Sequence, residues 1–429
     1  MSDNEKIIAL IQREVVPAIG CTEPIAVALC VAKATELLNN KPEHITVSLS
    51  ANIIKNAMGV GIPGTGMIGL PIAIALGALV GKSDYQLEVL RDSNANAVEE
   101  GKKYISENRI TIVHEKTDEK LYIKVETEAS GHKAIAVIAG AHTSFVRLEQ
   151  DGKVLMDKPA SAATVATSDD VELNMKKIWD FALSAPVESI RFILKARDLN
   201  DAVSKESLKG NFGHQVGRTL SNRNLRFDPF GDTIHSRVVA RTAAAADARM
   251  AGCPMAVMSN SGSGNQGIAT TMPVVAFAEE TKATEEQMIR ALILSNLTAI
   301  YIKQNLGRLS ALCGCVVAST GSACGMTYLM GGSYEQVTYT IQNMAATLTG
   351  MLCDGAKPSC ALKLATGVST ALMCAQLAMD GHYVTEVEGI VSANVDETIK
   401  NMTYIGRDGM VETDKMVLEV MTNKTPQRN

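Results

Sequence analysis

The side chains most able to do chemistry in this chain are thiols. Two of the nine cysteines, Cys353 and Cys360, stand on either side of an Asp-Gly turn in the segment "MLCDGAKPSCALK". Thiolates held at one turn can bind a metal or an iron–sulfur cluster, and a lone thiolate can act as a nucleophile or base. The competing interpretation is that both residues pack in the core, since free cysteine is among the most buried residue types.

Two further segments carry cysteines in settings that suit chemistry. Cys21 stands in "AIGCTEPIA", directly before a predicted helix, and the free amides of a helix N-terminus lower the pKa of a nearby thiol. The segment "RLSALCGCVVASTGSACG" holds Cys313, Cys315 and Cys324. The spacing is not that of a zinc ribbon, because there is no CxxC pair. The pattern alone leaves each thiol open as a ligand, a base or a core residue.

Two glycine-rich segments could form loops that bind a polar ligand. Neither "VGIPGTGMIGLP" nor "MSNSGSGNQGIATTMP" is a phosphate-binding loop of the Walker type, because no GK[ST] follows. The second segment combines freed backbone amides with hydroxyl and carboxamide groups, which suit the carboxylate and ammonium of a small amino acid. Its candidate residues are Ser259, Asn260, Ser261, Ser263, Asn265 and Gln266. The alternative is a polar loop that caps the following helix.

Other titratable residues near these segments have a structural explanation as well as a chemical one. His142, at the end of a predicted strand, is either a proton carrier or a hydrogen-bonded bystander. Charges in the alanine-rich segment "RTAAAADARMAG" and beside Cys360 are expected on solvated helix faces. These charges are Arg241, Asp247, Arg249, Lys357 and Lys363. No lysine stands in a recognisable pyridoxal phosphate context.

The N-terminal half must position its residues with helices followed by strands. Helical spacing covers 5–16 and resumes at Pro24, with Thr22 as the expected cap. Alternation of apolar and polar residues then predicts strands over 44–52 and 109–156, with a helical piece between them. From about residue 168 onward helical periodicity dominates, beginning with a helix that Ser168, Asp169 and Asp170 would cap.

These patterns predict an α+β protein in two parts. Residues 1–41 and 168–429 would form a predominantly helical catalytic domain, rich in small residues, that carries the cysteines. Residues 42–167 would form a smaller α/β module in the N-terminal half. Cys353 would end one helix and Cys360 would begin the next, so that a tight helix–turn–helix brings both sulfurs to one point.

The bulk composition narrows the class of partner. A net charge of −5 gives no general attraction to nucleic acid or to acidic membranes. The N-terminal segment carries charges where an export signal needs an apolar run, and the longer apolar runs are too short or too diluted to span a bilayer. We therefore expect a cytoplasmic protein with a small-molecule substrate, whose cysteines are not in disulfides. Self-association into a homo-oligomer stays open.

Five segments stand together in one order: "GCTEP", "PGTGMIGLP", "SNSGSGNQGI", "RLSALC" and "CDGAKPSCA". Through them the chain resembles, over nearly its whole length, the L-cysteine desulfidase family, a relative of the catalytic alpha chain of iron–sulfur L-serine dehydratases. The resemblance implies an oxygen-sensitive [4Fe–4S] carbon–sulfur lyase. Such an enzyme splits L-cysteine into pyruvate, ammonia and hydrogen sulfide by β-elimination, without pyridoxal phosphate.

The resemblance also implies roles for individual residues. It makes Cys313, Cys353 and Cys360 the cluster ligands. Cys315 has no counterpart in the family pattern but lies two residues from Cys313, so it is the alternative ligand. Cys21 would be a base or an occasional fourth ligand, and His142 is the second candidate for the base. Beside the 259–266 loop, the α/β module would contribute Lys55, Asn56 and Thr65 to substrate binding, which places the site between the two parts. The cysteines assigned to packing are Cys30, Cys253, Cys324 and Cys374.

Three other functions stay open from the sequence. A dehydratase for L-serine or another β-hydroxy amino acid would need the same base and Lewis acid, and only the leaving group would differ. A non-catalytic metal-binding or amino-acid-binding protein could retain the same fold. A structural zinc protein would use the same thiols without an open coordination position.

Overall fold

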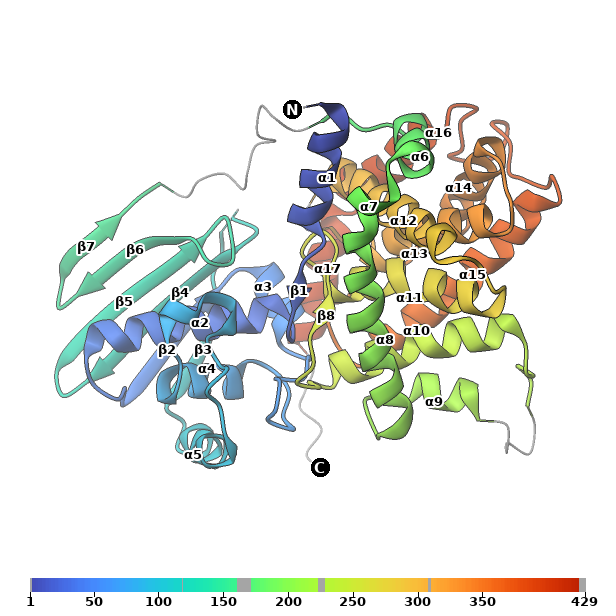
Figure 1. The fold of residues 1–429 in the computed structure, drawn as a ribbon. Helices are drawn as coiled ribbons and strands as arrows, with labels where there is room; N and C mark the ends of the chain where they lie inside the picture. Colours follow the sequence, from blue (N-terminus) through green and yellow to red (C-terminus); the bar gives the residue numbers. More distant parts are fainter. Residues whose placement is uncertain (1, 118, 160–170, 223–227, 308–309, 424–429) are drawn as a thin grey trace.

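The molecule has a sheet-containing part and a helical part that lie side by side (Figure 1). The computed structural model describes residues 2–117, 119–159, 171–222, 228–307 and 310–423. The predicted α+β class is confirmed, with helices dominating the larger part. Its core combines alanines with many larger aliphatic residues such as leucine and isoleucine.

The sheet has six strands in the order β3-β2-β4-β5-β6-β7. Its strands are β2 (His44–Leu49), β3 (Ile110–His114), β4 (Tyr122–Ala129), β5 (His132–Ala139), β6 (Phe145–Gln150) and β7 (Lys153–Asp157). β2 pairs in parallel with β3, and every other pairing in this sheet is antiparallel. Alternate residues of β4, such as Ile123 and Val125, are fully buried, as the period of two requires for a sheet covered on one face.

Helices α2 (Thr22–Leu38) and α4 (Leu70–Leu79) pack together beside the sheet, and residues of both share its hydrophobic core. Small residues let the two helices approach closely: a Cβ on Gly77 would lie 2.7 Å from the carbonyl oxygen of Ala28. The shorter helices of this part are α3 (Ala51–Ala57), η1 (Ser83–Glu88) and α5 (Ala95–Ser106). The sequence-based division assigned residues 1–41 to the helical domain, whereas α2 packs against the sheet.

The helical part is built around α13, which contacts α11, α12, α14 and α15. Glycine permits these contacts, since a Cβ on Gly325 would lie 2.9 Å from the carbonyl oxygen of Ala291 in α12. Its helices are α1 (Asp3–Glu14), α6 (Met175–Ser184), α7 (Val187–Ile190), η2 (Arg191–Ile193), α8 (Leu194–Lys209), α9 (Val216–Ser221), α10 (Ile234–Met250), α11 (Gly264–Glu280), α12 (Glu285–Leu306), α13 (Gly314–Leu329), α14 (Tyr334–Leu348), α15 (Cys360–Met379), α16 (Val395–Tyr404) and η3 (Ile405–Gly409).

Two of the contacts that join the parts come from β1 and from the last described helix. The short strands β1 (Pro17–Ala18) and β8 (Val257–Met258) pair antiparallel where the chain passes from α1 to α2. At the other end of the sequence, α17 (Val411–Thr422) returns to the sheet-containing part, where Leu418 packs into its core. Asp414 of this helix forms an ion pair with Lys55 of α3.

Several predicted boundaries differ from the structure. α2 begins at Thr22 and Cys21 is its N-cap, so Thr22 is not the cap that the sequence suggested. The cap predicted at Ser168 to Asp170 lies outside the described residues, and α6 begins after Asn174, whose side chain accepts a hydrogen bond from the Lys177 amide.

One helix in the described part of the chain, α15, is long and apolar enough to cross a membrane by length and composition. More than half of its apolar window is buried, in contacts with α10, α13 and α14. A core helix passes the same test, so this finding is weak evidence for a membrane span.

Candidate functional site

A two-stranded bridge places two of the predicted ligand cysteines side by side. Leu312 and Leu352 form an isolated antiparallel β-bridge just before α13 and between α14 and α15. The amide of Cys313 donates to the Met351 carbonyl at 3.0 Å, and the amide of Cys353 donates to the Ala311 carbonyl at 2.7 Å. Because α14 ends at Leu348, Cys353 lies in this extended segment, and the prediction that it ends a helix is wrong.

The Cys313 and Cys353 side chains are hydrogen-bonded to each other. This bond lowers the pKa of Cys353, and the positive charges of Lys55 and Lys363 act in the same direction against burial. The same bond, together with burial, raises the pKa of Cys313. The pair therefore favours one thiolate, at Cys353, with the Cys313 thiol as its donor.

Cys360 is the first residue of α15 and completes a group of three thiols around the 354–359 turn. Its thiol points toward the carbonyl oxygen of Gly355 at 3.5 Å, and burial raises its pKa. On its other side Cys360 packs against a small cluster formed by Cys21, Val60 and Met250. Four cysteines from both parts of the fold thus gather at one junction.

The degree of burial separates the predicted ligands from the other cysteines. All nine are free thiols; Cys313, Cys353 and Cys360 are partly exposed, whereas the remaining six are buried. Packing cysteines are expected in the second group. Burial alone therefore distinguishes the three positions that the resemblance assigned to the cluster.

Cys315, the alternative ligand, lies in a helix–helix contact. Its thiol donates to the Lys363 carbonyl at 3.0 Å, and burial raises its pKa to about 12. A Cβ on Gly367 of α15 would lie 2.6 Å from this sulfur, so α13 and α15 meet closely here. This packing favours Cys313 over Cys315 as the residue that faces the other thiols.

The lysines beside Cys360 are structural parts of the turn, and the prediction that they are solvated helix charges is wrong. Lys363 donates to the Leu352 carbonyl at 2.7 Å and forms an ion pair with Asp354. Lys357 pairs with the same carboxylate at 2.6 Å. Although partial burial opposes the shift, these bonds lower the pKa of Asp354 to about 2. The network fixes the turn that carries Cys353 and Cys360.

Cys21 stands at a helix N-terminus, as the sequence indicated, but it is not an activated thiolate in this structure. Burial raises its pKa, and the carboxylate of Glu23 adds to that effect. The Cys21 thiol donates to Oε2 of Glu23 at 3.1 Å. The expectation of a lowered pKa is therefore wrong, because burial and a nearby negative charge outweigh the helix amides. Glu23, two residues along the same motif, was not singled out from the sequence.

The sheet-containing part contributes α3 and the loop that follows it. Lys55 is only 3% exposed, and its charge acts on the Cys353 thiol. The Asn56 carbonyl lies 3.9 Å from the Cys21 sulfur. Thr65, by contrast, uses its hydroxyl inside its own turn, where it donates to the Ile62 carbonyl at 2.8 Å. The first two lie at the thiol junction, and Thr65 stabilises the glycine-rich loop.

Most polar side chains of the 259–266 loop have internal partners. Asn260 is fully buried and bonded to Asn296 of α12 at 2.9 Å, and Ser259 donates to the Val16 carbonyl at 2.6 Å. Ser263 caps α11, as the structural alternative predicted, and Ser261 donates to Oδ1 of Asn260.

The last two residues of the loop differ from the rest. Asn265 accepts a hydrogen bond from Arg249 at 3.1 Å. The buried Oε1 of Gln266 has no partner in the described part of the chain, and it would lie 3.2 Å from a Cβ on Gly314, next to Cys313. The N-terminal end of α11 therefore directs the unpaired Oε1 of Gln266 toward the thiols.

Two charges that were expected on a solvated face of α10 are buried. Asp247 and Arg249 are 1% and 5% exposed. Burial raises the pKa of Asp247 to about 6, and its carboxylate accepts the Gly217 amide at 2.9 Å. Arg241, on the same helix, pairs with Asp201 and Glu279. The run of alanines was the available signal, since a helix that lacks a polar face is buried all round.

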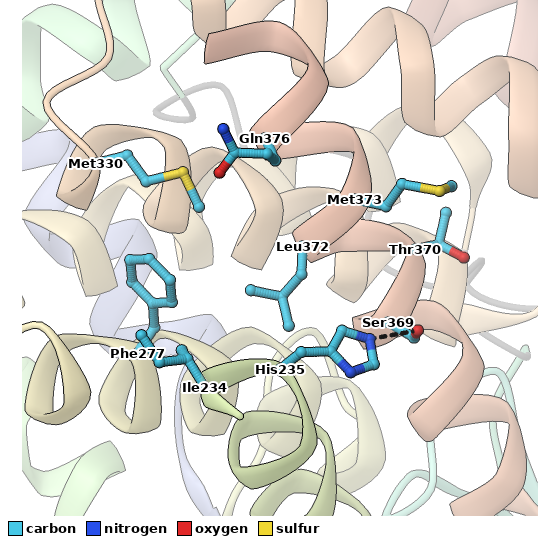
Figure 2. Close-up of a pocket in the computed structure, with 9 residues that line it drawn as sticks. All are labelled: Ile234, His235, Phe277, Met330, Ser369, Thr370, Leu372, Met373 and Gln376. Atoms are coloured by element: carbon cyan, nitrogen blue, oxygen red, sulfur yellow. Dashed lines mark hydrogen bonds between the residues drawn. The ribbon is translucent and has the colours of Figure 1, made fainter. Parts of the chain in front are cut away.

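Two remaining features lie in other elements. His142 occupies the turn between β5 and β6, and its role as a proton carrier stays a prediction. A pocket of about 550 Å³ lies among α10, α11 and α15, where His235 and Ser369 are hydrogen-bonded at 2.7 Å (Figure 2). None of the predicted site residues lines it, and it is separate from the thiol junction.

Comparison with known proteins identifies the relatives of this chain. Residues 84–419 match the model of the serine dehydratase alpha chain. The chain belongs to the serine dehydratase alpha chain family. It is 60% identical to a UPF0597 protein of Bacteroides fragilis over 424 residues, which is 99% of both chains. A UPF0597 protein of Photobacterium profundum is 46% identical over 421 residues, 97% of this chain and 98% of that protein. The family supports a dehydratase-type lyase.

The three thiols of Cys313, Cys353 and Cys360 suit a cluster of the kind that the family resemblance implies. No three His, Cys, Asp or Glu side chains converge on a single ion position within the residues described. A four-iron cluster does not require this, because each thiolate binds a different iron. Three partly exposed thiols surround one turn, and the ammonium groups of Lys55 and Lys363, which are paired with Asp414 and Asp354, lie close enough to Cys353 to lower its pKa. These donors and charges fit an anionic thiolate-bound cluster.

Proposed function

We propose that this protein is an iron–sulfur-dependent L-cysteine desulfidase, which eliminates hydrogen sulfide from L-cysteine to leave pyruvate and ammonia. The observation that carries the proposal is the separation of the cysteines: the three ligand candidates are partly exposed around one turn, and the other six are buried. Membership of the serine dehydratase alpha chain family supports the same class of reaction. A cytoplasmic location, expected from the sequence, suits an oxygen-sensitive cluster.

In this proposal Cys313, Cys353 and Cys360 hold a [4Fe–4S] cluster. Bound through three thiolates, the cluster would keep one iron open to the substrate and supply a Lewis acid. The 354–359 turn sets the positions of two of the three sulfurs, and the Leu312–Leu352 bridge fixes the third relative to them. Lys363 ties the turn to the bridge through the Leu352 carbonyl.

Removal of the α-proton requires a base, and Cys21 is the first candidate. Its thiol donates to Oε2 of Glu23 at 3.1 Å, which orients the side chain. Because burial and Glu23 raise the pKa of Cys21, the thiol would have to lose its proton on entering the reaction before it could act as the base. Cys21 also packs against Cys360, which puts this base next to the proposed cluster. His142 is the second candidate, and Cys21 as a fourth ligand stays open.

The substrate would lie between the two parts of the fold. Gln266, with its unused acceptor beside Gly314, is the member of the 259–266 loop best placed to bind it. Asn265 lies next to it in α11. Lys55 and Asn56 approach from α3, whereas Ser259, Asn260 and Thr65 shape the surrounding loops through their internal hydrogen bonds.

The second candidate reaction is the dehydration of L-serine or another β-hydroxy amino acid. The family description favours it, since the matching model is that of a serine dehydratase chain. The two reactions need the same groups and differ only in the leaving atom. Measuring sulfide released from L-cysteine and pyruvate formed from L-serine with the same preparation decides between them.

The test is anaerobic reconstitution with iron and sulfide, followed by both assays, for the parent and three variants. The parent and Cys324→Ala, a packing control in α13, are expected to turn brown and to release sulfide. Cys353→Ala is expected to do neither, and Cys315→Ala is expected to retain its iron. A parent that stays colourless and inert would contradict the proposal and leave a non-catalytic binding protein or a zinc protein.

A further inference from the structure

Arg249 is a buried positive charge that has no acidic partner among the residues that the structure describes. Its side chain lies in α10 and is 5% exposed. One terminal nitrogen donates to the Gly20 carbonyl at 3.0 Å, and the other donates to Oδ1 of Asn265 at 3.1 Å. Its Nε has no acceptor among the described residues, and no ion pair of Arg249 occurs there.

The other arginines of the same helix show what is missing. Arg237 pairs with Glu280 at 2.8 Å, and Arg241 pairs with Glu279 at 2.6 Å. Both are more exposed than Arg249, yet each has two carboxylate partners. Burying a guanidinium without a counter-charge is costly, so a buried arginine normally faces a carboxylate. Arg249 is the most buried arginine of α10, and among the described residues it is the one that lacks a carboxylate partner.

The position of Arg249 connects it to the proposed site from two sides. Gly20 directly precedes Cys21, and Asn265 is adjacent to Gln266 in α11. The guanidinium lies against the backbone of Gly264, where a Cβ would be only 2.7 Å from Cζ. Glycine at the start of α11 is therefore what allows the arginine to reach this place.

We propose that Arg249 binds the carboxylate of the substrate and so restricts the site to α-amino acids. The unpaired Oε1 of Gln266, on the same end of α11, is then the matching acceptor for the substrate ammonium group. The free Nε of Arg249 lies against Gly264 and the free Oε1 of Gln266 belongs to the same N-terminal end of α11, so this end offers one donor and one acceptor for the two charges of a zwitterion. The inference rests on the proposed function only in its assumption that the bound amino acid then reacts. Binding of an α-amino acid at Arg249 can be tested without the reaction.

The experiment is titration calorimetry of anaerobically purified protein with L-alanine and with L-alaninamide. L-alanine has no leaving group and is not turned over, and the amide differs from it only in lacking the carboxylate charge. The parent is expected to prefer L-alanine. Arg249→Gln is expected to lose about 10- to 100-fold of that preference, the range of one or two charged hydrogen bonds. Arg241→Gln, on the same helix, is the matched control and should keep it.

Two further variants keep the test decisive. Arg249→Lys retains the charge and should keep most of the preference. Gly264→Ala changes no charge but displaces the guanidinium, so it should lose the preference for L-alanine over L-alaninamide as Arg249→Gln does. If Arg249→Gln fails to fold, the Gly264→Ala variant takes its place in the test. A parent that binds neither ligand, or an Arg249→Gln variant that still prefers the carboxylate, would overturn the assignment. If Arg249→Gln loses the preference but the parent releases no sulfide from L-cysteine, the proposed reaction is refuted and the carboxylate site is supported.

Discussion

Replacing Gly355 with alanine should separate the thiol turn from the sheet-containing part. Gly355 is buried, has φ of +91°, and packs on the backbone at the end of α3, where a Cβ would overlap the Lys55 carbonyl and lie 2.8 Å from its carbon. A left-handed conformation costs a residue with a side chain about 1–2 kcal/mol. Overpacking against backbone that cannot move aside adds about 1–3 kcal/mol. We therefore expect Gly355→Ala to lower the free energy of unfolding by about 2–5 kcal/mol.

A second glycine isolates the contribution of the clash. Gly381 follows α15, has φ of +76°, and nothing lies within 4 Å of its missing Cβ. Gly381→Ala should therefore lose only the conformational share, about 1–2 kcal/mol. Urea denaturation at equilibrium gives both values, and iron bound per chain after reconstitution reports on the thiols. Equal losses in the two variants, or full iron binding by Gly355→Ala, would refute the argument that this contact holds the turn.

Three more predictions concern the same region. Asp354→Asn should lower the free energy of unfolding by about 1 kcal/mol at pH 7. A pKa near 2 instead of 3.8 corresponds to about 2.4 kcal/mol, and the partial exposure of the carboxylate reduces this value. This contribution is present above pH 3.8 and is lost as the pH falls toward 2. The free energies of unfolding of the parent and the variant should therefore converge as the pH is lowered. A difference that stays constant with pH would contradict the prediction. Gly367→Ala should destabilise the α13–α15 contact by about 1–3 kcal/mol, and by less in a Cys315→Ala background, as a double-mutant cycle would measure. Cys21→Ala should lower kcat for sulfide release by about 10²–10⁴-fold while iron binding stays unchanged, and loss of the iron instead would make Cys21 a ligand.

The sequence was most informative where the signal is local. Cys360 begins α15, as the helix start predicted at this residue required. The strands of the sheet followed from alternation in the same way. Both depend on residues close together in the chain, where the helical and strand periods are visible directly. The motif order likewise directed attention to the cysteines that the structure leaves partly exposed.

What the sequence could not supply depends on contacts between distant segments. The β-bridge between Leu312 and Leu352 joins residues forty positions apart, and no pattern within either segment predicts it. The N-terminal amides of α2 argued for a thiolate at Cys21, but the surrounding burial that reverses this arises only in the folded molecule. The alanines around Arg249 indicated a buried helix, but its partners, Gly20 and Asn265, come from other segments and cannot be read from that pattern.

The last helix has a consequence for how the protein is made. α17 follows every other described element, yet Leu418 packs among the first strands and helices, and Asp414 neutralises Lys55. During synthesis, therefore, Lys55 stays without this carboxylate partner until α17 has been made and has docked. The charges around the Cys353 thiol, which Lys55 influences, therefore reach their final arrangement only after α17 has docked.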